Sequence, residues 1–209
     1  MKDPATGAPW DLADKKVQSR VMKLVQQTEP FCIVGSPPCT PFSRLQELNK
    51  GRRDKATVQK EFQRGRDHIK FCIELYKMQI KGCRHYVHEH PKTSTAWQLP
   101  EMIEFIMRID AVITDTCMCA FGMTAVDELG SGLVKKETRI MTSSPEVAKR
   151  VTRQCQGGHR HVLLISGRAK HAQVYPRSFC NMICEGIAAQ KKIDELGIIV
   201  KPVMTVAES

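Results

Sequence analysis

One cysteine lies in a loop that its own sequence makes rigid. Cys39 sits among prolines in residues 35–43, GSPPCTPFS, directly after a short apolar run at residues 31–34. A cysteine attacks as its thiolate, and a loop between a strand end and a helix start can lower the thiol pKa through backbone N–H groups and the helix dipole. Pro37 and Pro38 stiffen this loop. The pattern predicts a nucleophile at Cys39.

A carboxylate follows a second strand-like run. Glu89 comes directly after residues 84–88, RHYVH. Addition to carbon 6 of a cytosine ring requires a nucleophile and a carboxyl group that engages ring N3, and Glu89 is the candidate for this carboxyl group. A base inside a duplex hides these atoms, so the nucleotide must be extruded and its backbone held by positive side chains. The basic residues after the proline-flanked loop, Arg52, Arg53 and Lys55, are candidates for that contact.

Alternating helical and strand-like patterns predict the elements that position these residues. Apolar residues at helical spacing alternate with short apolar runs that end at Gly or Pro. The expected helices cover residues 17–25, 58–80 and 99–106, and the expected strands cover residues 31–34, 84–88 and 111–114. The order β-α-β-α-β favours parallel strands covered by helices, which place ligands beyond the carboxyl ends of the strands. Cys39 and Glu89 both fall there, so we expect them to share a cleft.

The second part of the chain continues the α/β pattern. Ser144 and Pro145 have the residue types of a helix N-cap and a first helical position. Further strands are expected at residues 138–142 and 161–165, another helix near Pro176, and a flexible loop at residues 130–132. No internal repeat or interdomain linker is visible. We therefore expect a single α/β domain over residues 1–209, with a C-terminal helical part from 143 to 209.

Composition bounds the partners and the location of the protein. The 32 Lys and Arg residues exceed the 22 Asp and Glu residues, and the formal net charge of +10 favours nucleic acid as a partner. No run of 18 apolar residues and no secretory signal is visible. We therefore expect no membrane partner and an intracellular, nuclear or cytoplasmic location. The nine cysteines are odd in number, which argues against a disulfide framework.

A compact turn offers a rival chemistry. Cys155, His159 and His161 are potential zinc ligands, and residues 117–119 or Cys180 could add a fourth. The spacing matches no common zinc module. We therefore expect no metal, with Cys155 and His161 packed and His159 exposed.

The motifs around the proline-flanked loop resemble those of DNA cytosine-5 methyltransferases. Residues 34–43 resemble the signature strand that ends in Gly-Gly-Pro-Pro-Cys-Gln before Phe-Ser, with Cys39 at the nucleophile position. Residues 86–91, YVHEHP, resemble the strand that carries Glu-Asn-Val, with Glu89 at the carboxylate position. Phe-Gly-Met at 121–123 and Thr-Arg-Ile at 138–140 resemble an aromatic-Gly turn and an arginine-bearing strand, so the resemblance implies a catalytic role for Arg139.

The resemblance also implies a fold and a cofactor. It implies a Rossmann-like, methyltransferase-type, mostly parallel sheet with helices on both faces, whose first strands are missing. The cofactor would be S-adenosylmethionine, contacted by Asp11, which lies in a segment similar to a cofactor-contacting Asp-Ile, and by Pro37 and Pro38. Ser43, together with the basic residues that follow it, would contact the nucleic acid, with DNA as the expected form.

Several residues depart from the family pattern and argue against methyltransferase activity of this chain by itself. Thr40 replaces Gln, His90-Pro91 replace Asn-Val, and no Phe-x-Gly-x-Gly turn precedes residue 31. We therefore expect this 209-residue chain to be inactive without an upstream cofactor-binding segment. The pattern resembles more closely the methyltransferase-like segments of LTR retroelement polyproteins of microalgae, which share the elements at 35, 88 and 167. The rest of a longer polyprotein is then a further expected partner.

Three functions of different classes remain open at this point. The first is a methyltransferase-like catalytic domain, and the second is a non-catalytic nucleic-acid-binding domain of a retroelement polyprotein. The third is a thiol-dependent enzyme of another kind or a zinc-stabilised interaction module.

Overall fold

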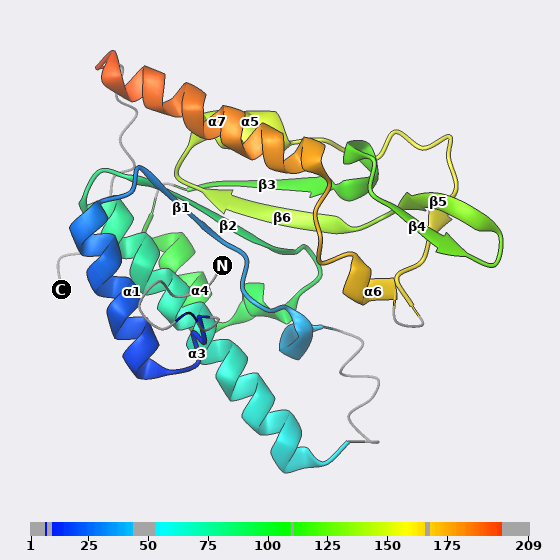
Figure 1. The fold of residues 1–209 in the computed structure, drawn as a ribbon, viewed down its shortest axis with the longest axis horizontal. Helices are drawn as coiled ribbons and strands as arrows, with labels where there is room; N and C mark the ends of the chain where they lie inside the picture. The colour runs from blue at the N-terminus through cyan, green and yellow to red at the C-terminus, as the bar shows by residue number, and fades with distance from the viewer. Residues whose placement is uncertain (1–6, 8–9, 44–52, 110, 166–167, 198–209) are drawn as a thin grey trace.

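The centre of the molecule is a four-stranded mixed sheet. The computed structural model describes residues 7, 10–43, 53–109, 111–165 and 168–197. The strands lie in the order β1 (Cys32–Gly35), β2 (His85–Pro91), β6 (Glu137–Thr142) and β3 (Val112–Cys117). β1 is parallel to β2, whereas β6 is antiparallel to both of its neighbours, β2 and β3 (Figure 1).

The expected mostly parallel, Rossmann-like sheet is therefore wrong. Two of the three strand pairings in this sheet are antiparallel. The reason is that β6 returns to the sheet without a crossover helix and inserts between β2 and β3, where Ile140 lies opposite both Glu89 and Thr114. A run of apolar residues predicts a strand, but where no helix connects the run to the preceding strand it carries no information about the direction or neighbours of that strand. The protein keeps only a general α/β character.

A second, smaller sheet extends from one end of the first (Figure 1). Its order is β4 (Thr124–Asp127), β5 (Gly130–Val134) and β7 (His161–Val162), with β4 and β5 antiparallel and β5 and β7 parallel. The expected loop at residues 130–132 is in fact the start of β5. The strand expected at 161–165 is limited to two residues.

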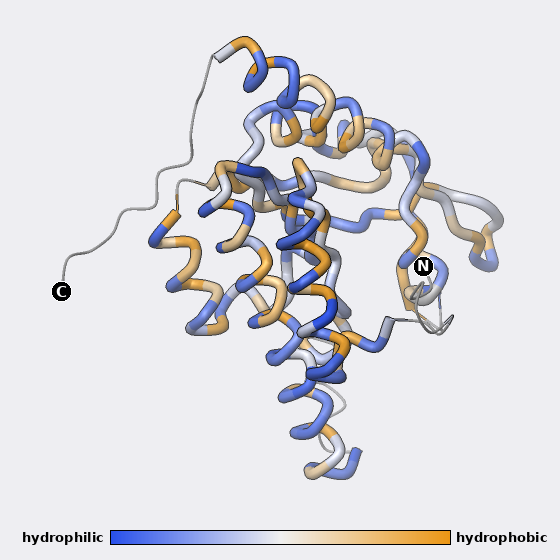
Figure 2. Tube along the Cα trace, turned by 60° about the vertical axis from the view of Figure 1, so that its left-hand side comes forward, coloured by the Kyte–Doolittle hydropathy of each residue, from blue (hydrophilic) through white to orange (hydrophobic). Residues whose placement is uncertain are grey.

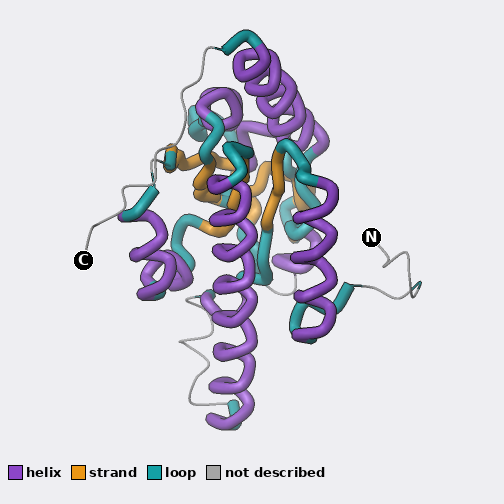
Figure 3. Tube along the Cα trace, turned by 90° about the vertical axis from the view of Figure 1, so that its left-hand side faces the viewer, coloured by secondary structure: helices purple, strands orange, loops and turns teal. Residues whose placement is uncertain are grey.

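Helices cover both faces of the main sheet, as Figures 1 and 3 show. One face carries α1 (Lys15–Thr28), α3 (Lys55–Lys81) and α4 (Pro100–Met107), and the other carries α5 (Pro145–Val151) and α7 (Arg177–Glu195). The short helices are η1 (Thr40–Phe42), η3 (Thr95–Gln98), η4 (Met118–Phe121) and α6 (Arg168–His171). The helices expected from helical periodicity are thus confirmed. Among the described residues, no helix has the length and apolar character needed to cross a membrane.

Capping residues explain where several helices begin. The Asp14 side chain accepts a hydrogen bond from the Lys16 amide at 2.8 Å, and the Asp54 side chain accepts one from the Thr57 amide at 2.7 Å. The expected cap of α5 is confirmed, because the Ser144 hydroxyl accepts a bond from the Val147 amide at 3.2 Å and Pro follows at the first helical position. Such caps satisfy amides that have no partner inside the helix.

Strand β2 separates two apolar cores because its side chains alternate between faces. Tyr86 points toward α3, where its ring stacks on Tyr76 at 4.6 Å between centroids. Val87 points the other way and packs with residues of α5 and α7 such as Val147 and Phe179. Figure 2 shows hydrophobic and hydrophilic residues alternating along the tubes of the covering helices. The sheet is therefore held between two helical layers.

Candidate functional site

The loop that carries Cys39 is fixed at both ends. It begins at Gly35, the last residue of β1, where an added Cβ would clash with the hydroxyl group of Tyr76. That hydroxyl group makes a 2.9 Å hydrogen bond with Nδ1 of the buried His88. A side chain at position 35 would displace this buried pair, so glycine is required here for close packing.

The other end of the loop packs on α3. A Cβ added to Gly65 would lie 3.0 Å from Cγ of Pro41 and 3.1 Å from the ring of Phe42. Phe42 is fully buried, and its carbonyl group accepts a 3.3 Å bond from the Thr95 hydroxyl. η1 is therefore held against α3, and Cys39, its N-cap residue, is held with it.

Cys39 and Glu89 line one cavity of about 240 Å³. They come together because β1 and β2 are parallel neighbours and both residues follow the register pair Gly35 and His88. The remaining walls come from Lys136, just before β6, and from the segment after α6. The lining residues are Ser36, Pro37, Pro38, Cys39, Thr40, Glu89, Pro91, Lys136, Gln173 and Tyr175.

Glu89 is a buried carboxylate with one oxygen engaged and one oxygen without a partner. The side chain of Ser36 donates to Oε2 at 2.5 Å, which fixes the orientation of the carboxylate. Oε1 is buried and has no hydrogen-bond partner of ordinary geometry among the described residues, although the Tyr175 hydroxyl group lies close enough to the Glu89 carboxylate for the two to interact. Only 4% of Glu89 is exposed. A buried acceptor without a donor is costly, so this oxygen is a natural place for a ligand to donate a hydrogen bond.

Lys136 supplies the cation of the cavity. Its ammonium group donates to the hydroxyl oxygen of Tyr175 at 2.8 Å and to the carbonyl oxygen of Ala172 at 3.0 Å. Burial lowers the pKa of Lys136, while the charges of Glu89 and Cys39 raise it. Burial also raises the pKa of Tyr175 well above its usual value, with Glu89 contributing in the same direction. Two of the three donors of the ammonium group are used, which leaves one for a ligand.

The surroundings of Cys39 favour the thiol over the thiolate. Burial raises the pKa of Cys39, and the negative charge of Glu89 raises it further, while Lys136 and a backbone hydrogen bond lower it. The backbone contribution to this pKa therefore has the expected direction, but the net shift is the opposite of the expected one. The structural reason is that desolvation by burial is the largest contribution and outweighs both the backbone hydrogen bond and the charge of Lys136.

Arg139 does not line the cavity. Its guanidinium group makes two hydrogen bonds of 2.8 and 3.1 Å with the carboxylate of Asp115, its cross-strand neighbour on β3. The group also lies 5.7 Å from the ring centroid of Trp97. The cation in the cavity is Lys136 instead, which the sequence does not distinguish from the adjacent Lys135.

The residues expected to contact a cofactor are divided between two adjacent pockets. Asp11 and Pro38 line a groove of about 480 Å³ on the other side of the Cys39 loop, together with Trp10. Pro37 lines the Cys39 cavity, and Pro38 and Thr40 line both. The carboxylate of Asp11 accepts a 3.0 Å bond from the Ala13 amide and pairs with Arg64 at 3.2 Å.

That groove combines an aromatic ring with a carboxylate. The guanidinium group of Arg20 lies over the Trp10 ring, 5.4 Å from its centroid, so one face of this ring is already in contact. The Asp11 carboxylate retains acceptor positions beyond its two observed contacts. Its volume falls within the range of roughly 300–1,000 Å³ that is typical of ligand pockets.

The residues expected to contact nucleic acid lie on either side of a segment that is not described. Ser43 follows η1, and its amide donates to the Thr40 carbonyl group at 3.2 Å. Arg53 pairs with Glu61 at 2.7 Å, and Lys55 is the first residue of α3. Arg52 lies outside the described residues.

The potential zinc ligands Cys155, His159 and His161 do converge, and the structure adds Cys119 to them as a fourth residue. The sequence left residues 117–119 and Cys180 as possible fourth ligands, and the structure places Cys119 near the other three.

The comparisons with known proteins identify no relative. No protein-family model matches the chain, and neither the curated proteins nor the solved structures contain a match. The interpretation of the site therefore depends on its own geometry.

Proposed function

We propose that the cavity formed by Cys39 and Glu89 binds a cytosine base of a nucleic acid, and that Cys39 adds covalently to carbon 6 of its ring. This is the chemistry that the resemblance to DNA cytosine-5 methyltransferases implies. The observation that carries the proposal is the buried, partnerless Oε1 of Glu89 in the same cavity as a thiol.

The shape and donors of the cavity support a single pyrimidine ring. A volume of about 240 Å³ is smaller than a typical ligand pocket and suits one heterocycle. The exocyclic amino group of cytosine would donate to Oε1 of Glu89, a pairing that carboxylates make with this base. The remaining donor of Lys136 would bind the ring carbonyl oxygen. Entry requires that the base leave its stack, as in enzymes that modify bases.

The proposed addition is balanced in atoms and electrons. A bond forms between Sγ of Cys39 and carbon 6, the double bond between carbons 5 and 6 breaks, and its electron pair moves through the ring to N3. The thiol proton passes through the Glu89 carboxyl group to N3. The charge of Glu89 raises the pKa of Cys39, and a hydrogen bond donated by the base to this carboxylate would offset part of that charge, so that Lys136 favours the thiolate more strongly.

The groove beside Trp10 and Asp11 is the proposed place for S-adenosylmethionine. Bound there, the cofactor would supply a methyl group for carbon 5 of the ring. We propose DNA as the nucleic acid and the remainder of a retroelement polyprotein as the natural context. The proposed location is intracellular, nuclear or cytoplasmic, in keeping with an odd number of cysteines that argues against a disulfide framework.

Deuterium exchange at carbon 5 tests the addition without any cofactor. The adduct makes carbon 5 basic, so it takes up a solvent deuteron before Cys39 leaves. We expect a single-stranded oligodeoxynucleotide with one cytosine, incubated with the wild-type protein in D₂O and then returned to H₂O, to retain a gain of one mass unit. Cys39→Ala should abolish the gain, and Cys83→Ala, which alters an exposed cysteine, should preserve it. Absence of exchange in both single-stranded and duplex DNA would contradict a catalytic role for Cys39.

A second candidate function is non-catalytic binding of nucleic acid. The raised pKa of Cys39 favours it, because an inert thiol suits a binding site better than a reactive one. This function predicts salt-sensitive binding that Cys39→Ala leaves unchanged and Lys136→Met weakens.

A further inference from the structure

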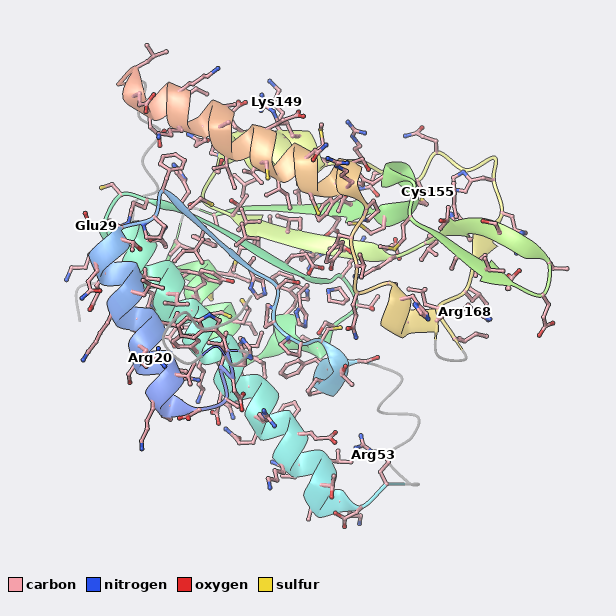
Figure 4. All side chains as sticks on the ribbon, viewed as in Figure 1. Arg20, Glu29, Arg53, Lys149, Cys155 and Arg168 are labelled. Carbon is pink, nitrogen blue, oxygen red and sulfur yellow. The ribbon has the colours of Figure 1, made fainter. Side chains whose placement is uncertain are left out.

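Four side chains with metal-binding atoms meet where the two sheets join. They belong to η4, to the segment after α5 and to β7, and Figure 4 labels Cys155 among them beside η4 and the β4–β5 hairpin. The sulfur atoms of Cys119 and Cys155 and one ring nitrogen each of His159 and His161 all lie within 4.8 Å of one another.

Local structure explains how residues from separate segments converge. The amide of Cys117 donates to the carbonyl oxygen of Arg153 at 2.9 Å, which joins the end of β3 to the segment after α5. Gly157 and Gly158 then adopt positive φ angles of 74° and 71°. Residues other than glycine rarely adopt positive φ angles. The two glycines therefore allow the chain to fold back, so that His159 faces Cys155.

The distances from the Cys155 sulfur atom to the two histidine nitrogens match those around a tetrahedral zinc ion. Sγ of Cys155 lies 3.5 Å from Nε2 of His159 and 3.4 Å from Nε2 of His161. With Zn–S bonds of about 2.3 Å and Zn–N bonds of about 2.0 Å, tetrahedral geometry separates sulfur from nitrogen by about 3.5 Å. The two Nε2 atoms lie 2.9 Å apart, and a small rotation of the exposed His159 would bring them to the expected separation of about 3.3 Å.

We propose that Cys119, Cys155, His159 and His161 bind a structural zinc ion. Two thiolates balance the charge of the dication, and two neutral imidazoles complete a four-coordinate site without an open position, which is the usual composition of a structural site. Cys117 is the nearest further thiol, with its sulfur 3.2 Å from that of Cys119, and can donate a hydrogen bond to that ligand.

At this position a zinc ion would connect parts of the structure that are separate in sequence. Cys119 follows Met118, whose amide donates to the carbonyl oxygen of Lys136 at 3.0 Å, and Lys136 forms one wall of the Cys39 cavity. His161 pairs with Leu133 in the second sheet. A zinc ion would thus tie the second sheet and the segment leading to Tyr175 to the main sheet.

Metal analysis of untagged, full-length protein tests the proposal. We expect one zinc ion per chain in the wild-type protein and its loss in both Cys155→Ser and His159→Ala. The matched controls are Cys180→Ser and His171→Ala, which alter an exposed cysteine and an exposed histidine outside the cluster and should retain the ion. Replacement by Co²⁺ should give the visible absorption of a tetrahedral site with thiolate ligands in the wild type and controls.

Two results would overturn the proposal. One is wild-type protein that contains no zinc and develops no tetrahedral spectrum with Co²⁺. The other is a Cys119–Cys155 disulfide in protein purified under reducing conditions. Because a ligand variant can fail to fold, zinc release from the folded wild type is also measured with a chromogenic chelator, and one ion per chain is expected.

Discussion

At the scale of single residues, the reactivity of Cys39 depends on two opposing charges. Glu89 raises the pKa of the Cys39 thiol and Lys136 lowers it, with burial as the largest influence. In Glu89→Gln we expect the pH at which iodoacetamide alkylates Cys39 to shift downward, and in Lys136→Met to shift upward. Alkylation is followed at the Cys39 peptide by mass spectrometry over a series of pH values.

The matched control for this experiment is Lys135→Met, because Lys135 is exposed and adjacent in sequence but does not line the cavity. Its profile should coincide with that of the wild-type protein. Identical profiles for Lys136→Met and Lys135→Met would show that the ammonium group of Lys136 does not act on the thiol.

At the scale of elements, β2 makes the fold sensitive to acid. Burial lowers the pKa of His88 from 6.5 to about 3, and burial followed by Lys136 lowers that of His90 from 6.5 to about 4. Both rings are neutral in the folded protein but bind protons in the unfolded chain below pH 6.5. Their contribution to stability is therefore complete above pH 6.5 and is lost as pH falls from 6.5 toward 4, by about 1.4 kcal/mol per pH unit for each ring.

Replacing His90 isolates the part of this pH dependence that comes from one of the two rings. The ring lies between Phe42 and Trp97, and neither nitrogen has a hydrogen-bond partner among the described residues. His90→Phe should therefore fold, and the slope of its urea-unfolding free energy against pH between 4 and 6.5 should be lower than that of the wild type by about 1.4 kcal/mol per pH unit. An unchanged slope would mean that His90 is protonated in the folded protein.

The contact between α5 and α7 depends on one glycine. A Cβ added to Gly186 would lie 2.7 Å from the Cα atom of Val147, a backbone atom that cannot rotate away. Alanine normally stabilises a helix relative to glycine by roughly 0.5–1 kcal/mol. We expect the opposite sign here, a loss of about 1–3 kcal/mol from overpacking in urea titration. The exposed neighbour variant Glu185→Ala should change stability by less than about 0.5 kcal/mol.

At the scale of the whole molecule, the sequence predicts elements better than it predicts their neighbours. Helical periodicity and the Ser144 cap depend on local geometry, so α1, α3, α4 and α5 follow from the sequence. The insertion of β6 between β2 and β3 is a long-range pairing without a local signal. That insertion pairs Arg139 with Asp115, whereas Lys136, just before the strand, lines the Cys39 cavity.

The difference between local signals and long-range contacts also decides how much of each candidate site the sequence predicts. Cys39 and Glu89 meet because β1 and β2 are parallel neighbours, which their sequence pattern predicts. Cys119 reaches Cys155 only because β3 and the segment after α5 are joined by the hydrogen bond between Cys117 and Arg153. Three of the proposed zinc ligands are close in sequence, and the fourth could be selected only from the fold.

If a zinc ion joins the sheets, its removal should loosen one defined region. Arg160 lies between His159 and His161 and is held by Asp127, with Nη1 2.7 Å from Oδ2, and by the carbonyl oxygen of Gly130 at 2.7 Å. A chelator that removes zinc should lower the thermal midpoint and make Arg160 the first new site of trypsin cleavage, because proteolysis follows local opening. Cys155→Ser should show this cleavage without chelator, and Cys180→Ser only after its addition. Cleavage at Arg160 that is equally fast before and after chelation of the wild type would show that this region is held by protein contacts alone.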